Sequence, residues 1–486
     1  MTSTDRQAGW KGRPGRFRLV FVAVVLAGLT ISVSPAGGQQ AVGPALPTPE
    51  ALARLWDAEH VSPPLPPLLR HAEIDTRLRA LREQTPDLFS LEEIGRSVEG
   101  RSLNHLSFGS GPYQVLLWSQ MHGDEPSATA ALLDVFEYIR RHRDEAVVRR
   151  LLGALTVHAV PMLNPDGAER FQRRNAQGID INRDALLLQT PEGRTLKALR
   201  DRLQPRIGFN LHNQGWRTSA GRTGRPATIS LLAVAYDEAR SDNEGRIVAK
   251  QTCSVIRDAL EPLAPGQIAR YDDEFEVRAF GDNLTKWGTS VVLIETGAFP
   301  ADPPDPALVR LNFVGLLTAL DALATGRVHA ADPARYESLP MNESNVFYLL
   351  IRNATIITGT GVAPFTGDVG LVANRSVLQG DGRRDIRQTL RIDDLGDLRV
   401  FGALEVIDAG GLTVAPLADP LLKAGDQTRL PDWSVRVTGP KIVPGEMADL
   451  MLLEPTRDPA VSTVRRIIRA AMTPPPATAG LGGRDR

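Results

Sequence analysis

Residues 113–136 of this 486-residue chain read YQVLLWSQMHGDEPSATAALLDVF, and they carry the clearest signal of its fold class. Its first eight residues are mostly apolar and short in extent, which is typical of a buried strand. From Pro126 onward the composition and the apolar repeat are helical, and a proline suits the first turn because an N–H there has no partner. The stretch therefore predicts a strand followed directly by a helix, as in an α/β fold.

His122 and Glu125 lie between that strand and that helix, a place where α/β folds commonly keep their chemistry. Their three-residue spacing lets a turn aim both side chains at one point, although His-x-x-Glu alone also fits an ordinary surface pair at a helix start. His212 strengthens the pattern, because it follows the short apolar strand candidate 206–211 and precedes polar loop residues. Two imidazoles and one carboxylate form the ligand set of a catalytic zinc site that keeps one position open.

A second acid, Glu295, lies within the apolar run 290–297. Water activated by a metal needs a nearby carboxylate to accept its proton. The chain thus contains both halves of a metallohydrolase. By contrast, His158 lies inside an apolar run, and we expect it to be a histidine of the sheet rather than a ligand.

Further blocks surround these residues and share a recognisable order along the chain: Ile94–Arg101, Pro161–Gly167, Arg173–Asp184, Leu211–Asn213 and Ile294–Gly297. Together with His122 and Glu125, they resemble the zinc carboxypeptidase family (carboxypeptidase A-like enzymes, also called funnelins). The resemblance covers roughly residues 70–325. It implies an α/β domain with a mixed, mostly parallel sheet flanked by helices, in agreement with the alternation of apolar strands and helical segments in that region.

The resemblance also implies roles for individual residues around one Zn²⁺ ion. His122, Glu125 and His212 would bind the metal, and Glu295 would be the general base that activates water and returns the proton to the leaving amine. Asp180 would orient His122 by accepting its second ring N–H, the usual arrangement for a metal-bound imidazole.

Substrate recognition is implied by the same carry-over. Arg173 would polarise the scissile carbonyl, although its neighbour Arg174 is an alternative that the family pattern favours less. Asn182 and Arg183 would hold the terminal carboxylate, since a guanidinium matches a carboxylate with two parallel hydrogen bonds. For Arg183 the other interpretation is a solvated salt bridge with Asp184.

A mobile tyrosine that closes over the substrate is expected before the catalytic glutamate. Tyr271 is the nearest upstream candidate, and Tyr236 is the only other tyrosine between His212 and Glu295. In the segment that would set specificity, Arg278 would select acidic side chains, whereas Phe280 would line an apolar pocket. The sequence leaves both choices open.

The termini and the composition limit the location and partners of the protein. A basic region, an apolar run over residues 19–33 and small residues at 34–38 predict a secretory signal peptide, with an uncleaved anchor as the alternative. We therefore expect an exported, periplasmic or secreted protein with no stable membrane insertion after signal removal. A net charge of −1 gives no reason to expect nucleic-acid binding. Cys253 is the only cysteine, which excludes disulfides within the chain and cysteine-based zinc clusters.

From about residue 343 the composition becomes β-rich and resembles the small β-sandwich beside the barrel of amidohydrolases of the dihydroorotase type. No histidine follows His329, so this module lacks the ligands for catalysis of its own. The predicted organisation is then as follows: signal peptide 1–38, proline-rich lead-in 39–69, catalytic domain 70–325, linker 326–342, all-β sandwich-like module 343–460 and a disordered tail 461–486.

The sequence favours an exported zinc metallocarboxypeptidase that acts on peptides or peptide-like amides with a free C-terminal carboxylate. The alternative is a non-catalytic peptide or cell-wall binding protein that uses the zinc cleft for recognition. The complete set of ligands, base and arginines weighs against this alternative.

Overall fold

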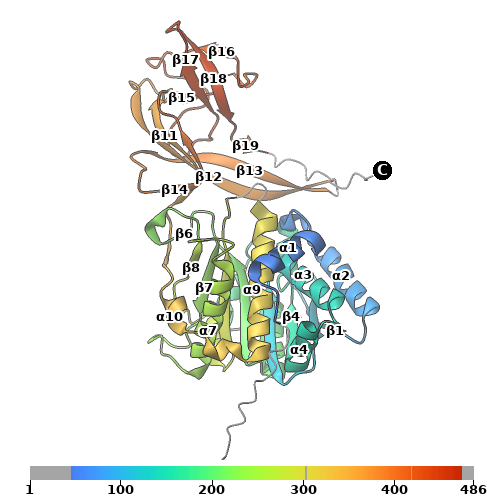
Figure 1. Cartoon of the computed structure of the whole chain (residues 1–486). Helices are drawn as coiled ribbons and strands as arrows, with labels where there is room; N and C mark the ends of the chain where they lie inside the picture. Colours follow the sequence, from blue (N-terminus) through green and yellow to red (C-terminus); the bar gives the residue numbers. More distant parts are fainter. Residues whose placement is uncertain (1–44, 301–303, 382, 418, 473–486) are drawn as a thin grey trace, which may run out of the picture. The chain divides into compact units, whose positions relative to one another are not determined.

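The computed structural model describes residues 45–300, 304–381, 383–417 and 419–472 (Figure 1). The predicted signal peptide lies outside the described residues, as does the end of the predicted tail. Two separate sheets account for most of the strands, and they differ in how they are buried.

The first sheet has eight strands in the order β1-β2-β4-β3-β5-β9-β7-β8. Its strands are β1 (Phe89–Arg96), β2 (Ser102–Phe108), β3 (Tyr113–Ser119), β4 (Leu155–Val160), β5 (Ile207–Asn213), β7 (Ile229–Ala233), β8 (Ile268–Arg270) and β9 (Ser290–Thr296). The pairs β4/β3, β3/β5, β5/β9 and β7/β8 are parallel, and the other pairs are antiparallel. The predicted α/β class with a mixed sheet is therefore confirmed.

Helices cover both faces of this sheet. They are α1 (Pro49–Glu59), α2 (His71–Gln84), α3 (Ser127–Arg141), α4 (Ala146–Ala154), α5 (Pro165–Arg170), α6 (Pro191–Leu203), α7 (Glu244–Leu260), α8 (Phe280–Lys286), α9 (Pro304–Thr325) and α10 (Pro333–Glu337), with 3-10 turns η1 (Pro66–Leu68), η2 (Ile181–Arg183), η3 (Gly221–Thr223) and η4 (Arg327–Ala330).

Alternate residues of the central strands point to two separate cores, as the two-residue period of a strand requires. On β3, Leu117 packs into the core beneath α3, α7 and α9, whereas Leu116 and Trp118 pack into the core beneath α6 and α8. Because helices cover both faces, the central strands are continuous apolar runs rather than alternating ones. This explains why residues 113–119 are apolar at nearly every position.

The proline-rich lead-in packs on the catalytic domain and contains a helix that its composition did not predict. Trp56 of α1 is 4% exposed and donates from Nε1 to Asp134 Oδ2 of α3 at 2.7 Å. The other oxygen of Asp134 accepts from the backbone N–H groups of Val61 and Ser62, both at 2.8 Å. One buried carboxylate thus anchors both the helix and the segment that follows it.

Helix α9 has the length and hydropathy of a membrane-crossing helix, but 83% of its apolar window is buried inside the protein. It packs against α1, α3, α4 and α7 in the first core, so its apolar surface is already covered. Cys253 of α7 is fully buried in the same core, and burial raises the pKa of its thiol.

The C-terminal region is all-β, as predicted, and its strands form the second sheet. This sheet has nine strands: β11 (Val346–Ile356), β12 (Phe365–Gly380), β13 (Arg383–Gly396), β14 (Gly402–Asp408), β15 (Thr413–Pro416), β16 (Gln427–Arg429), β17 (Leu450–Pro455), β18 (Val461–Ile468) and β19 (Ala471–Met472). The short strands β6 (Ser219–Ala220) and β10 (Asn342–Glu343) pair separately.

Two predicted boundaries need correction. The predicted tail from residue 461 begins with an ordered strand, β18, which pairs with β17 along its length. The predicted linker 326–342 contains η4 and α10, and it ends in β10, which pairs with β6 of the catalytic domain. The linker gains order by pairing with β6, which is distant in sequence, whereas β18 pairs with β17, the strand just before it in the chain.

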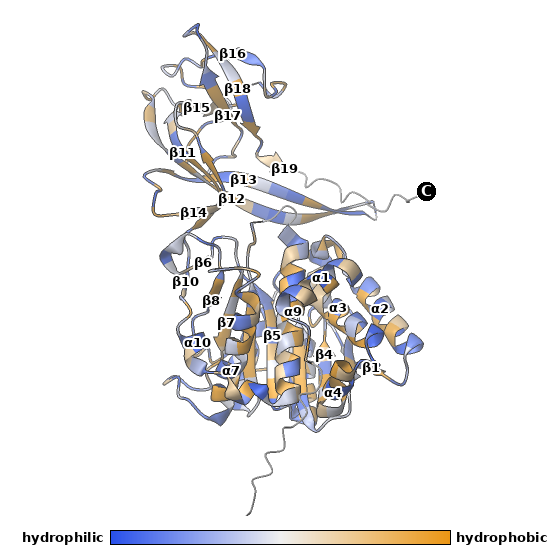
Figure 2. Cartoon of the chain, in the orientation of Figure 1, coloured by the Kyte–Doolittle hydropathy of each residue, from blue (hydrophilic) through white to orange (hydrophobic). Residues whose placement is uncertain are grey.

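The two sheet regions contact each other at close range. At Gly402 of β14 an added Cβ would lie 1.7 Å from the backbone oxygen of Gly224, so a larger residue fits there only if the backbone shifts. Arg384 of β13 donates to the backbone oxygens of Leu69 at 2.9 Å and Ala168 at 3.0 Å. In Figure 2 the central strands of the catalytic sheet are largely orange, whereas blue residues are frequent on β12 and β13.

Candidate active site

The three predicted ligand residues converge. His122 and Glu125 follow β3, and His212 lies on the neighbouring strand β5. Glu125 Oε1 is 2.8 Å from His122 Nδ1, and Glu125 Oε2 is 2.7 Å from His212 Nδ1. All three side chains are buried, and their potential ligand atoms lie within 4.8 Å of one another. This is the arrangement that a single metal ion requires.

Local backbone geometry explains how the turn after β3 brings His122 and Glu125 together. Gln120, directly after β3, has a positive φ of 50°, which turns the chain sharply. At Gly123 an added Cβ would lie 2.0 Å from the carbonyl carbon of Gly167, so only glycine fits between the two ligands. Helix α3 then begins at Ser127, directly after Pro126.

Asp180 lies behind His122, as the resemblance implied. His122 Nε2 is 3.1 Å from Asp180 Oδ1, which leaves Nδ1 directed toward Glu125 and His212. Burial lowers the pKa of His122, but the Glu125 and Asp180 carboxylates outweigh it and raise that pKa to about 9. Burial raises the pKa of Glu125, and the two imidazoles outweigh it and lower that pKa to about 2. An anionic carboxylate between two imidazole nitrogens is a donor set that fits Zn²⁺.

Glu295 lies beside this cluster. On β9 it is the register neighbour of His212 on the parallel strand β5, so the two side chains leave the sheet next to each other. The residue is 9% exposed, and among the described residues its Oε2 has no hydrogen-bond partner. Burial, followed by the charge of Glu125, raises the pKa of Glu295 well above its ordinary value. A buried, unpaired acid at this place is suited to hold and move a proton.

Of the two arginine candidates, only Arg173 reaches the cluster. Its Nε donates to Asp180 Oδ2 at 2.9 Å, and its Nη1 lies 3.2 Å from His122 Nδ1 and 3.7 Å from Glu125 Oε1. Arg174 is exposed and donates instead to the backbone oxygen of Gly178. The structure therefore puts a guanidinium from residue 173, not 174, at the cluster.

Asn182 and Arg183 lie in η2, directly after Asp180. Asn182 Oδ1 accepts from the backbone N–H of Phe280 at 2.9 Å, which fixes the turn against α8. Arg183 is 3.2 Å from Glu276 and is not paired with Asp184, whose carboxylate accepts from Gln189 and Thr190. The interpretation of Arg183 as a salt bridge with Asp184 is therefore wrong.

Tyr271 follows β8 and is half-buried against the core beneath α6 and α8. Burial raises the pKa of its phenol, and the nearby Glu295 carboxylate raises it further. In the segment before α8, Phe280 is fully buried in the core, whereas Arg278 is exposed and paired with Glu276. Of these two, only Arg278 has a surface that a ligand reaches.

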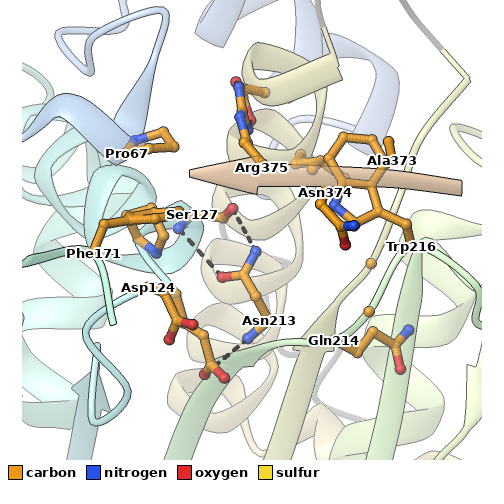
Figure 3. A pocket seen from close by; sticks show the side chains of 16 residues that line it. Pro67, Asp124, Ser127, Phe171, Asn213, Gln214, Trp216, Ala373, Asn374 and Arg375 are labelled. Atoms are coloured by element: carbon orange, nitrogen blue, oxygen red, sulfur yellow. Dashed lines mark hydrogen bonds and ion pairs between the residues drawn. The ribbon is translucent and has the colours of Figure 1, made fainter. Parts of the chain in front are cut away.

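Sequence reasoning missed a pocket beside the cluster (Figure 3). Its volume is about 330 Å³, and Glu125 forms part of its wall. Asn213 links the pocket to the metal ligands, since its backbone N–H donates to Glu125 Oε2 at 3.1 Å and its side chain donates to Ser127 Oγ at 2.7 Å. Another part of the wall comes from β12, more than 150 residues after Asn213 in sequence. No local sequence pattern predicts that contact.

Residues 74–214 match the family model described as zinc carboxypeptidase, and this range contains all three clustered ligands. The segment that carries the cluster is therefore similar in sequence to the zinc carboxypeptidase family.

Several known carboxypeptidases are similar to part of this chain. Carboxypeptidase E of Caenorhabditis elegans is 33% identical over 135 residues, which are 23% of this chain and 28% of that protein. The carboxypeptidase N catalytic chain of Rattus norvegicus is 33% identical over 144 residues, 24% of this chain and 31% of that one. The match thus spans less than a third of either relative. A solved metallo-carboxypeptidase from Burkholderia cenocepacia is 20% identical with a TM-score of 0.41, covering 52% of this chain and 69% of that chain.

Proposed function

We propose that this protein is an exported, zinc-dependent metallocarboxypeptidase that hydrolyses the C-terminal amide bond of peptides. The observation that carries the proposal is the convergence of His122, Glu125 and His212 beside the unpaired acid Glu295. The N-terminal sequence supports export, and the family match supports the hydrolase class.

When bound, zinc would supply Lewis-acid polarisation of the carbonyl and would acidify water at the site. His122, Glu125 and His212 are the residues that would hold it. Asp180 keeps the His122 ring in the orientation that presents Nδ1, because it occupies Nε2.

The remaining side chains would carry out the proton and charge work. Glu295 takes a proton from the attacking water and returns it to the leaving amine. Arg173 donates to the carbonyl oxygen as negative charge develops there, and Asp180 holds its guanidinium in place. Asn182 and Arg183 bind the terminal carboxylate, and Tyr271 closes over the bound residue. Because Arg183 is 36% exposed and its partner Glu276 is 32% exposed, an incoming carboxylate reaches it from solvent.

Chelation followed by metal replacement tests this proposal. Purified protein is expected to contain about one equivalent of zinc, to lose hydrolysis of a defined peptide mixture with a chelator, and to regain it with zinc. Mass spectrometry of the products should show loss of single C-terminal residues. Internal cleavage would contradict the roles of Asn182 and Arg183. Full metal content without turnover across the mixture would favour a peptide-binding protein instead.

A further inference from the structure

The pocket beside Glu125 is built by two regions of the chain. Asp124, Ser127, Phe171 and Asn213 come from the catalytic domain, and Ala373, Asn374 and Arg375 come from β12. Figure 3 shows Asn374 and Trp216 on one side of the pocket, across from Phe171. Its volume of about 330 Å³ lies at the lower end of the range for small-ligand pockets.

The hairpin formed by β12 and β13 is held in place over the pocket by charge-assisted contacts. Arg375 makes two parallel hydrogen bonds to Asp305 at the start of α9, at 2.9 and 2.6 Å. The two side chains are only 14% and 7% exposed, so this ion pair is largely shielded from solvent. Gln379 also donates to the backbone oxygen of Glu169. The part of the pocket wall that comes from β12 is therefore bonded to the catalytic domain.

The polar groups of the pocket differ in whether they are already engaged. The side chain of Asn213 is bonded to Ser127, and that of Gln214 to Ala227 and Asn342. Asn374 is exposed, and its amide makes no hydrogen bond within the described parts of the chain. An amide offers both donors and an acceptor, which matches the alternating groups of a peptide backbone. Trp216 adds a flat aromatic surface beside it.

The residues that line the pocket indicate which part of a substrate would enter it. Arg173, Asn182 and Arg183 are absent from the residues that line it, whereas Glu125 lines it directly. A peptide with its carboxylate at Arg183 and its scissile carbonyl at the cluster would continue toward this pocket with the residues that precede the scissile bond.

We propose that this pocket binds the two or three substrate residues that precede the scissile bond, with Asn374 of the C-terminal module as a specificity-determining contact to their backbone. The proposal rests on the proposed carboxypeptidase function. It assigns the C-terminal module a part in substrate binding, although that module carries no histidine. The same pocket would favour short peptide segments over folded chains, because the anchored hairpin forms one of its walls.

The test compares two substrates that share a C-terminal residue. One is an N-acetylated dipeptide, with a single residue before the scissile bond, and the other is an N-acetylated tetrapeptide, with three. Asn374→Trp should fill the pocket and lower the ratio of kcat/KM for the tetrapeptide to that for the dipeptide at least tenfold. Asn374→Ala, which removes one amide, should lower the same ratio about threefold.

Ser376→Trp is the matched control. Ser376 is exposed on the same strand, two residues farther along, and does not line the pocket. It should leave the ratio within twofold of that of the unmodified protein. Equal effects of the two tryptophan variants, or no effect of Asn374→Trp, would overturn the proposal.

A binding measurement separates this inference from the proposed function. In a tetrapeptide analogue the scissile amide is replaced by a methylene-amine, and its affinity is measured by calorimetry on the zinc-loaded protein. Asn374→Trp should weaken binding at least tenfold, and Ser376→Trp should not. If the unmodified protein hydrolyses neither substrate but binds the analogue with this same sensitivity, the pocket stands and the carboxypeptidase function is refuted. Turnover of both substrates with analogue affinity indifferent to Asn374→Trp would refute the pocket alone.

Discussion

The central strands of the catalytic sheet and the β12–β13 hairpin use polar residues in opposite ways. Strands β5 and β9 are buried at nearly every position, and His212 and Glu295 lie near their carboxyl ends. On the hairpin, β12 has no buried residue beyond Leu371, β13 alternates between buried and more exposed residues over much of its length, and polar side chains occur on both strands. The strands covered on both faces thus hold His212 and Glu295 in place, whereas the half-exposed hairpin lines the pocket beside Glu125.

The largest effect is expected from replacing Glu295, the buried acid on β9. Glu295→Gln should lower kcat by about 10² to 10⁴-fold, because the amide no longer accepts the proton of water. Zinc content should remain near one equivalent, since Glu295 is not among the three clustered ligands. Metal analysis and steady-state kinetics on the same sample check both expectations. Normal turnover in this variant would remove Glu295 from the role of base.

A second substitution tests the ion pair between Arg375 and Asp305 that holds the hairpin. Arg375→Met leaves Asp305 buried without its partner, which should destabilise the docked hairpin by about 3 kcal/mol. Hydrogen exchange in β12 and β13 should become faster, whereas exchange in β5 and β9 should change little. Arg387→Met is the control, because Arg387 is an exposed arginine of the same hairpin. Equal effects of the two variants would show that the ion pair does not hold the hairpin.

A third substitution tests the proposed contact between Arg183 and the terminal carboxylate of the substrate. Arg183→Ala should lower kcat/KM for a peptide acid by about 10- to 100-fold, the value of one or two hydrogen bonds to a charged group. The corresponding peptide amide, which lacks the carboxylate, should show a much smaller loss. Arg174→Ala, which removes an exposed arginine that does not reach the cluster, should leave both rates nearly unchanged.

The smallest expected effect concerns pH. Burial raises the pKa of Asp282 in α8 to about 7, although backbone hydrogen bonds act in the opposite direction. The folded protein therefore binds a proton at Asp282 that the unfolded chain releases near pH 4. The resulting stability is present below pH 4 and is lost as the pH rises through 7. We expect Asp282→Asn to flatten this part of the melting-temperature profile. A profile unchanged by this substitution would exclude Asp282 as the titrating group.

The metal cluster was predictable because each ligand lies next to a strand end that its own neighbours define. His122 follows the apolar run that becomes β3, and His212 lies near the end of the run that becomes β5. In parallel strands these ends meet at one edge of the sheet, so sequence patterns alone bring the residues together. Asp180 and Arg173 were identified through the family pattern, and the structure places both at His122.

The parts that escaped prediction either depend on contacts between distant segments or carry a misleading local pattern. The Arg375–Asp305 pair spans 70 residues, and neither neighbourhood has a motif that indicates the other. Strand β18 was missed because its pairing with β17 shifts register between Leu452 and Leu453, which breaks the alternation that marks a strand. Helix α1 was hidden by flanking prolines, although Pro49 itself begins the helix.

The rate at which a reagent labels the single thiol, Cys253, would report how fast the catalytic domain opens. It is enclosed on α7 within the first core, and its raised pKa suppresses the reactive thiolate form. A thiol reagent would therefore label the native protein only as fast as this helix layer comes apart. With no second cysteine to give background signal, the rate of labelling would follow one event in one place.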